Sequence, residues 1–309
     1  MEGFKYSQLE IARIMGEPRD PRKPYPDLVA AVCQTATAEP DEYVYYFDVL
    51  LETDKVYTFT TTGTLTSENV SPDTPVLFDF MDISTPEYYV KVTDLAKAKE
   101  ATLARKLLTI DRSLNAYENW YLVSLASAAA IGVSKTHTLQ SGRVRFSYDD
   151  VIIMTEDVVD YGDNYTLMVG ASIDRDMKLW DWNDNTYASM NEAFLNLGIT
   201  KIRVPNLTFT LDTTMTPNML DNKVAYLIAN NTEVGKPFLF VRKRLNDIDL
   251  LGAAIKQSGE KPERLIFASP NPISASGGTT RYLAVGLTGY EEIVAACVNP
   301  YAVSKFTKA

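Results

Sequence analysis

The sequence predicts an α+β fold, and three observations support this class. Residues Asp94–Ala130 carry a single, unusually long helical pattern. The segment before it, residues 41–92, is rich in the aromatic and β-branched residues that favour strands. Beyond the helix, helical and strand patterns mix without the regular alternation of a doubly wound parallel sheet. We therefore expect one long helix with strand-rich segments laid across it, followed by a mixed region.

The long helix is predicted from unbroken apolar periodicity. Neither Gly nor Pro interrupts it, Thr93 or Asp94 provides a cap for the first amides, and Gly132 ends it. At about 1.5 Å per residue it spans roughly 50 Å. A coiled coil is the alternative, but the apolar stripe is short and rich in Ala, so we expect a single spine helix. The apolar positions are Leu95, Leu103, Leu107, Ile110, Leu114, Tyr117, Tyr121, Leu125 and Ala128.

The N-terminal residues predict a short helix followed by an extended arm. Ser7–Glu10 has the spacing of a capping box, and Gly16 ends the helix that it would open. Residues 18–26 hold Pro18, Pro21, Pro24 and Pro26 with three basic side chains, a composition that excludes helix and paired strand. This arm is either a flexible linker or a stiff segment that lies on a neighbouring molecule.

Four strands are predicted before the long helix: 43–51, 56–62, 76–81 and 88–92. Residues 52–55 and 84–87 are the expected turns within the two successive pairs. Nothing in this stretch offers a core of its own, and long two-stranded ribbons are marginal unless they lie against another surface. We therefore expect the ribbon to need a partner.

The chain after the long helix predicts two further helices and several strands. Ser147–Asp150 opens a helix that continues to Val159, with acidic residues in its first turn. A second helix covers Ala188–Leu197 and is closed by Gly198. The predicted strands are 165–172, 199–204, 224–229, 237–241, 264–268, 283–287 and 292–298.

Composition limits the class of protein. The 309 residues are 46% hydrophobic and 23% charged, as in an ordinary globular protein. The formal net charge of −10 argues against broad nucleic-acid binding. Cys33 and Cys297 give no disulfide framework, and no apolar signal region or membrane span is evident, so we expect a reducing cytosol.

Searches for catalytic motifs predict no enzyme. The sequence has no phosphate-binding glycine loop, no Cys-x-x-Cys, no His-Glu-x-x-His and no Gly-x-Ser-x-Gly. The single histidine, His137, is expected to be structural or merely exposed. We therefore assign no catalytic, cofactor-binding or metal-binding residue and no cofactor.

One partial calcium motif needs an interpretation. Five residues match calcium-loop positions one, three, five, nine and twelve, but Thr186 stands where the loop needs Gly. A polar loop that caps the helix beginning near residue 188 explains the same residues, and we favour it; whether the loop binds a metal stays open. The five matching residues are Asp181, Asn183, Asn185, Ser189 and Glu192.

Charged clusters have ordinary and functional interpretations. The acidic set Asp157, Asp160 and Asp163 predicts a solvated face, as do the pairs Asp174/Asp176 and Asp247/Asp249. The basic run at residues 242–244, Arg-Lys-Arg, either faces solvent or meets a neighbour's carboxylates or packaged phosphate.

The order of the elements resembles that of the major capsid proteins of tailed bacteriophages, the Hong Kong-97-like coat family. The likeness rests on this architecture and not on a signature motif. The nearest similarities in sequence are Phe146–Val151, like the helix that opens the axial domain; Thr216–Asn222, like a proline-bearing turn; and Tyr290–Tyr301, like the returning strand. The resemblance implies an N-terminal arm (1–40), an extended loop and strand ribbon (41–92), a peripheral domain with the spine helix (93–145), an axial domain (146–289) and a return to the peripheral domain (290–309).

The resemblance also implies a function. Such a protein is the coat subunit of an icosahedral head, assembles as hexamers and pentamers in the host cytoplasm, and encloses double-stranded DNA without reading its sequence. Scaffold, portal and decoration proteins are the expected partners, with no membrane, and the virion is the final location. Some relatives crosslink a loop lysine; Lys55 lies at the ribbon turn, but no crosslink is assigned to it. The alternatives are an encapsulin-like compartment shell and a cytosolic binding module or enzyme.

Overall fold

A computed structural model describes residues 25–39, 41–42, 44–47, 76–139, 142–180, 189–206, 218–231, 235–245, 254–255, 263–274 and 280–308. Several predictions fall outside these ranges. They are the N-terminal helix and most of the proline arm, the strand at 56–62 with Lys55, the first part of the calcium-like loop, and the acidic pair at 247 and 249.

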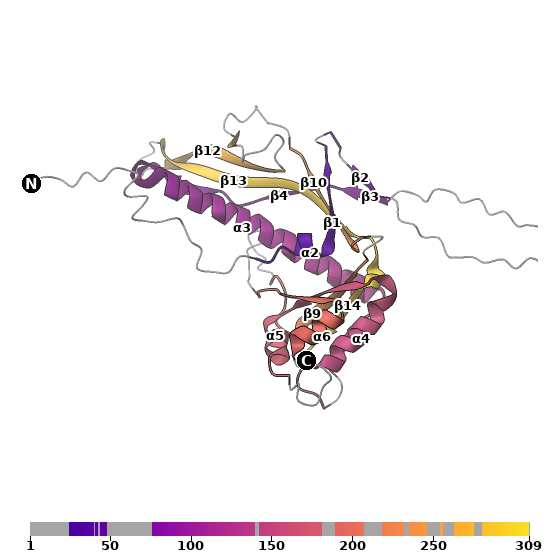
Figure 1. The fold of residues 1–309 in the computed structure, drawn as a ribbon. Helices are drawn as coiled ribbons and strands as arrows, with labels where there is room; N and C mark the ends of the chain where they lie inside the picture. Colours follow the sequence, from indigo (N-terminus) through magenta and orange to yellow (C-terminus); the bar gives the residue numbers. More distant parts are fainter. Residues whose placement is uncertain are drawn as a thin grey trace, which may run out of the picture.

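The spine helix is confirmed. Helix α3 covers Val92–Gly132 without interruption and exceeds the predicted range by two residues at each end. Figure 1 shows it running along the strands in the upper part of the picture before its last turns reach a second group of strands and helices below. Its buried face includes Ile110, Leu114, Leu122 and Ala126, spaced as helical periodicity requires.

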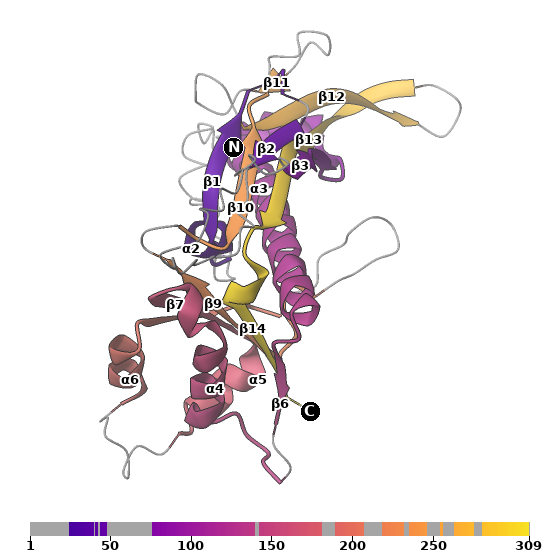
Figure 2. The same cartoon turned by 90° about the vertical axis from the view of Figure 1, so that its right-hand side faces the viewer.

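A seven-stranded sheet lies along α3. Its path is β1-β10-β13-β12-β11, and β4 and β5 also pair with β13. Figure 2 shows β1, β10 and β13 side by side. The strands are β1 (Cys33–Ala38), β4 (Met81–Ser84), β5 (Tyr88–Lys91), β10 (Phe238–Lys243), β11 (Ala254–Ile255), β12 (Arg264–Ser274) and β13 (Thr280–Cys297).

Residues 84–87 are not a turn, which corrects the predicted pairing of the strands on either side. Both β4 and β5 pair antiparallel with β13, so the chain keeps its direction across this segment. Thr85 fixes the segment between β4 and β5 to β13, because its amide donates to the Gly289 carbonyl (2.8 Å) and its hydroxyl accepts from the Gly289 amide (2.9 Å). Pro86 has no amide proton to give a ladder. The long strand β13 offers room for both partners.

The described part of the ribbon shows a pairing that the sequence did not predict. Strand β2 (Val44–Phe47) pairs antiparallel with β3 (Val76–Asp79), across the 48–75 segment, while the strand predicted at 56–62 lies outside the described residues. A ladder between strands so far apart in sequence carries no turn signal that the sequence could display.

Two strands predicted at 283–287 and 292–298 form the single strand β13. Gly286 and Gly289 lie where other side chains come close to the β13 backbone, and not in turns. A Cβ on Gly289 would lie 2.3 Å from Cγ2 of Ile110 on α3, and one on Gly286 would meet the Glu87 side chain. Likewise β12 continues past residue 268 to Ser274, with a register shift at Asn271/Pro272 where a proline cannot donate.

A five-stranded sheet forms the lower unit, in the order β6-β14-β9-β7-β8. One face packs on the last turns of α3, and the other is covered by α4, α5 and α6 (Figure 1). The elements are β6 (Thr136–Thr138), α4 (Tyr148–Val158), η1 (Val159–Tyr161), β7 (Asn164–Val169), α5 (Ala171–Met177), α6 (Met190–Asn196), β8 (Ile199–Arg203), β9 (Val224–Asn230), η3 (Pro300–Ala302) and β14 (Val303–Thr307).

The later strands are divided between the two sheets. The strands predicted near 237–241 and 264–268 are β10 and β12, which belong to the sheet along α3. Conversely, 303–307 lies in the lower sheet, between β6 and β9. Residues 28–38, which were expected in the arm, form helix α2 (Leu28–Val32) and the edge strand β1, which runs parallel to β10.

Candidate functional site

A buried charge cluster joins the spine helix to the sheet. Glu118 lies on the inner face of α3 and is buried. Arg242 of β10 donates to it from Nε (3.0 Å to Oε1) and from one terminal nitrogen (2.9 Å to Oε1 and 3.0 Å to Oε2). This forked arrangement suits the planar guanidinium, which binds carboxylates through two nitrogens.

Arg264 extends the cluster to two more strands. Its Nε donates to Glu291 of β13 (2.6 Å), and its terminal nitrogens reach Asp111 (2.5 Å) and Asn115 (2.8 Å) of α3. One of these nitrogens also lies 3.0 Å from Glu118. Two guanidinium groups therefore face three carboxylates, and the helix is fixed to β10, β12 and β13 at one point.

Glu291 is the most confined member of this cluster. It is fully buried, and its Oε1 has no hydrogen-bond partner among the described residues. Burial raises the pKa of Glu291 to about 7, with the neighbouring Glu118 adding to the rise and Arg264 opposing it. The carboxyl therefore titrates near neutral pH inside the contact between helix and sheet.

All three side chains of the basic run at 242–244 pair with carboxylates of this chain, which corrects its interpretation as a solvated face; contact with a neighbour's carboxylates or packaged phosphate stays a prediction. Besides the Arg242 fork, Lys243 lies 2.9 Å from Glu292 and Arg244 lies 2.6 Å from Glu39. The sequence does not reveal these carboxylates, because they come from distant strands and from the residue after β1.

The lower unit contains a second polar junction, where α4 meets β6 and β14. Asp157 accepts from Ser304 (2.7 Å) and lies 2.5 Å from Nε2 of His137. Lys135 donates to the carbonyls of Asp157 (2.5 Å) and Tyr301 (2.6 Å). Asp157 is thus a partner in a junction, and the prediction of a solvated face is wrong for this residue. His137 occupies a structural position there.

Asp174 and Asp176 are buried, which corrects the solvated face predicted for them. Asp174 lies 3.0 Å from Lys178 and 3.1 Å from Lys201. Burial raises the pKa of Asp174, but the hydrogen bonds from these two lysines outweigh it, and the pKa lies below its usual value. Asp176 accepts from the Phe146 amide (3.1 Å) and from Lys308 (2.5 Å), fixing α5 to both neighbouring segments.

No protein-family model matches the sequence, and no curated protein is similar to it in sequence. Solved structures match along almost the whole chain. A protein of Microbacterium phage Oxtober96 has a TM-score of 0.60 at 13% identity, covering 98% of this chain and 99% of that one. The capsid structure of Cyanophage P-SCSP1u has a TM-score of 0.58 at 9% identity, covering 99% of each chain.

This chain has the Hong Kong-97-like capsid fold. The holo-SrpI encapsulin complex from Synechococcus elongatus PCC 7942 also matches, with a TM-score of 0.50 at 9% identity, covering 98% of this chain and 96% of that one. Similarity at such low identity establishes the fold. The α+β class and the spine helix predicted from the sequence belong to it.

Two of the five residues in the calcium-like motif, Ser189 and Glu192, lie in the described part of the chain. Ser189 caps α6 by accepting from the Glu192 amide (3.3 Å), as the capping interpretation requires, while residues 181–188 lie outside the described ranges. Within those ranges no three His, Cys, Asp or Glu side chains are placed to hold a metal ion together. No helix in the described part of the chain is long and apolar enough to cross a membrane.

The buried charge cluster was not predicted from the sequence. Glu118 has the helical spacing of an inward position, four residues after Leu114 and three before Tyr121, and this spacing was the only local signal. Its partners Arg242 and Arg264 follow more than a hundred residues later, so no motif connects them.

Proposed function

We propose that this chain is the major coat subunit of a tailed-phage head, an icosahedral shell that encloses double-stranded DNA. The observation that carries the proposal is the likeness of the whole chain to proteins of two phages, one of them in a capsid structure, over 98–99% of both chains. The role is structural, and the chain is not an enzyme.

The internal packing supports a subunit whose long helix keeps a fixed shape. A helix of 41 residues would bend easily if it were held only at its ends. Here the cluster of Glu118, Arg242, Arg264 and Glu291 fixes its middle to three strands. Buried ion pairs specify geometry more than they add stability. A subunit that must repeat many times with one shape benefits from such fixation.

The proposal includes the partners and limits implied by the fold. Hexamers and pentamers of this chain form the wall, with scaffold, portal and decoration proteins as further partners and the virion as final location after assembly in the host cytoplasm. The same proposal divides the chain into an arm (1–40), a ribbon (41–92), a peripheral part (93–145 and 290–309) and an axial part (146–289). Sheet membership supports one change to these bounds, which assigns 238–297 to the peripheral part and 303–307 to the axial part.

An encapsulin-like compartment shell is the second candidate, supported by the match to the holo-SrpI encapsulin complex. Both candidates predict closed particles, so particle contents separate them. Particles from the native source that contain nuclease-protected double-stranded DNA support the phage head. Particles that contain a co-purifying protein cargo and no protected DNA support the compartment shell.

Negative-stain microscopy of the purified, concentrated chain tests the proposal itself. We expect closed, roughly spherical particles of uniform diameter. A chain that stays monomeric across a wide range of protein concentration and ionic strength, with and without co-expressed candidate scaffold protein, contradicts it.

A further inference from the structure

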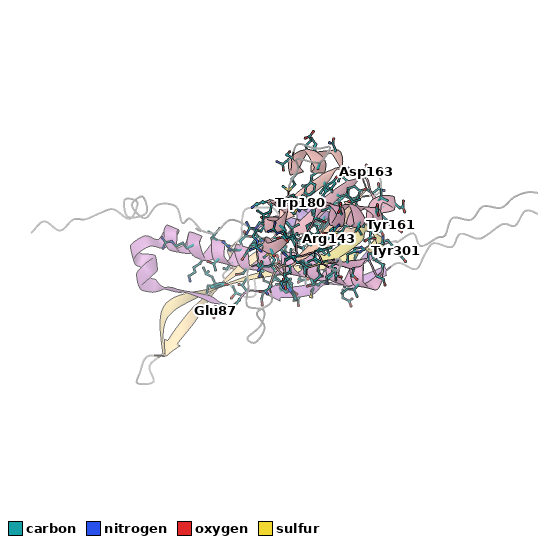
Figure 3. The ribbon with its side chains drawn as sticks, turned by 90° about the horizontal axis from the view of Figure 1, so that it is seen from below. Glu87, Arg143, Tyr161, Asp163, Trp180 and Tyr301 are labelled. Atoms are coloured by element: carbon teal, nitrogen blue, oxygen red, sulfur yellow. The ribbon has the colours of Figure 1, made fainter. Side chains whose placement is uncertain are left out.

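The two ends of strand β7 carry opposite charge. Helix α5 begins directly after β7 ends, and η1 finishes shortly before β7 begins. We call the surfaces of the lower unit at these two places the α5 end and the η1 end. A strand of six residues separates these ends by about 20 Å. Figure 3 shows the same separation, with Tyr161 and Tyr301 together at one side of the lower unit and Trp180 toward the other.

The α5 end is basic. Lys178, Lys201 and Arg203 surround the single buried carboxylate of Asp174, and Arg175 is exposed beside them. Four basic side chains therefore gather around one buried carboxylate, while the exposed carboxylates of Glu192 and Asp221 lie on neighbouring segments. Lys178 and Arg203 are themselves more than half exposed, so this positive charge reaches the surface.

The η1 end is acidic. Glu156 and Asp160 are exposed on the last turns of α4 and on η1, and Asp163 is exposed just beyond. Among the described residues, Lys135 supplies a basic side chain at this end. Its Nζ donates to two carbonyls and lies 4.5 Å from the centre of the Tyr161 ring. Negative charge therefore remains on this surface.

Each charged end also exposes large apolar side chains. Leu179 is 56% exposed and Leu195 81% exposed at the α5 end, while Val159 is 53% and Tyr301 51% exposed at the η1 end. An aromatic pair lies at each end. Trp180, which follows Leu179 in the sequence, packs edge-on against Phe194, which precedes Leu195, with ring centres 6.2 Å apart. Tyr301 stacks on Tyr161, with centres 5.8 Å apart.

We infer that the α5 end of one subunit binds the η1 end of a second copy of this chain. Apolar residues framed by opposite charges are what a specific interface between two protein surfaces requires. Because the two surfaces differ, the contact is head-to-tail, and repetition closes a ring where the rotation permits. The inference rests on the proposed function and adds the residues through which neighbouring subunits meet.

Charge reversal tests this contact. The first variant is Arg175→Glu with Lys178→Glu, and the second is Glu156→Lys with Asp160→Lys; Arg105→Glu, at an exposed position on α3, is the matched control. We expect each double variant to lose roughly tenfold or more of its assembled fraction in sedimentation velocity, because like charges would face each other. The control should assemble as the wild type does. Unchanged far-ultraviolet circular dichroism and melting temperature verify that each variant is folded.

Mixing the two double variants separates a head-to-tail contact from nonspecific damage. One variant presents two acidic ends and the other two basic ends, so an equimolar mixture restores alternating contacts, and we expect assembly to recover. Assembly of both variants at the wild-type level overturns this inference and leaves the proposed coat function intact. Folded variants that fail singly and also fail when mixed overturn it too. A wild-type chain that forms no oligomer overturns both.

Discussion

Arg242 and Glu118 lie 124 residues apart in the sequence, yet three hydrogen bonds of 2.9–3.0 Å join their side chains inside the protein. This pair connects the middle of the spine helix to β10, and through Arg264 the same carboxylate is linked to β12 and β13. We therefore expect the position of the spine helix on the sheet to depend on these few buried charges.

Replacing Arg242 by Ala is expected to lower the free energy of unfolding of the isolated subunit by about 3–5 kcal/mol, because it leaves Glu118 buried with less compensation. Arg244→Ala is the matched control. Its pair with Glu39 is partly exposed, so the loss should stay below about 1 kcal/mol. Urea unfolding followed by tryptophan fluorescence measures both, and equal losses for the two variants would refute the special role of the cluster.

The stability of the subunit should depend on pH through Glu291. Its folded pKa of about 7 lies above the ordinary value of 4.5, so the folded state holds more protons than the unfolded state between these limits. The free energy of unfolding contributed by this group is therefore greatest at or below pH 4.5 and falls as pH rises towards and through 7. Glu291→Gln, which cannot titrate, should make the profile less steep between about pH 5 and 8. Identical slopes for the two proteins would exclude this role for Glu291.

Gly289 is expected to tolerate no side chain, because a Cβ there would lie 2.3 Å from Ile110. Gly289→Ala should cost about 1–3 kcal/mol of unfolding free energy through overpacking between α3 and β13. Gly132→Ala is the control, since no atom lies within 4 Å of the added Cβ, and it should be neutral or slightly stabilising.

A second-site change extends the Gly289 test. Ile110→Ala removes the clashing Cγ2, so the double variant should be more stable than the sum of the two single losses predicts. Additive losses would place the damage of Gly289→Ala elsewhere.

Both cysteines should resist alkylation in the folded subunit. Burial raises the pKa of Cys297 to about 12 and holds that of Cys33 higher still, so the reactive thiolate is scarce at pH 8. Iodoacetamide labelling followed by mass spectrometry should proceed slowly in buffer and quickly in strong urea. Rapid labelling of either residue in buffer would show that its strand opens readily.

The sequence predicted best where one element determines its own pattern. The spine helix repeats its apolar spacing over many turns, so α3 was recognisable almost to its ends. Pairing between distant strands has no such local record. Residues 84–87 have the composition of a turn, but their geometry depends on β13, two hundred residues later. The strands predicted at 283–287 and 292–298 are likewise one strand, in which Gly286 and Gly289 accommodate Glu87 and α3.

The charges were harder to interpret for the same reason. Asp174 and Asp176 look like an exposed acidic pair in sequence, yet lysines from β8 and from the end of the chain neutralise them. A local sequence shows the charge of a residue, and only the fold shows its partner. Small elements such as α2 and β6 were missed because five-residue and three-residue segments carry too little periodicity to detect.

The proposed arm and ribbon contribute one more prediction. In the free subunit, the amides of β2 and β3 should exchange with solvent quickly, because a two-stranded sheet is marginal alone. In particles the same amides should be protected by neighbouring subunits. Hydrogen exchange measured on both states decides this, and strong protection in the free subunit would assign the ribbon to the subunit's own core.

Single-particle cryo-electron microscopy of the assembled protein is the sharpest test of the proposed coat function. We expect a closed icosahedral shell of hexamers and pentamers, with α3 and the seven-stranded sheet in the wall and the α5 end of each subunit against the η1 end of the next. Particles without icosahedral symmetry, or a preparation that contains only monomers and small closed oligomers, would contradict it.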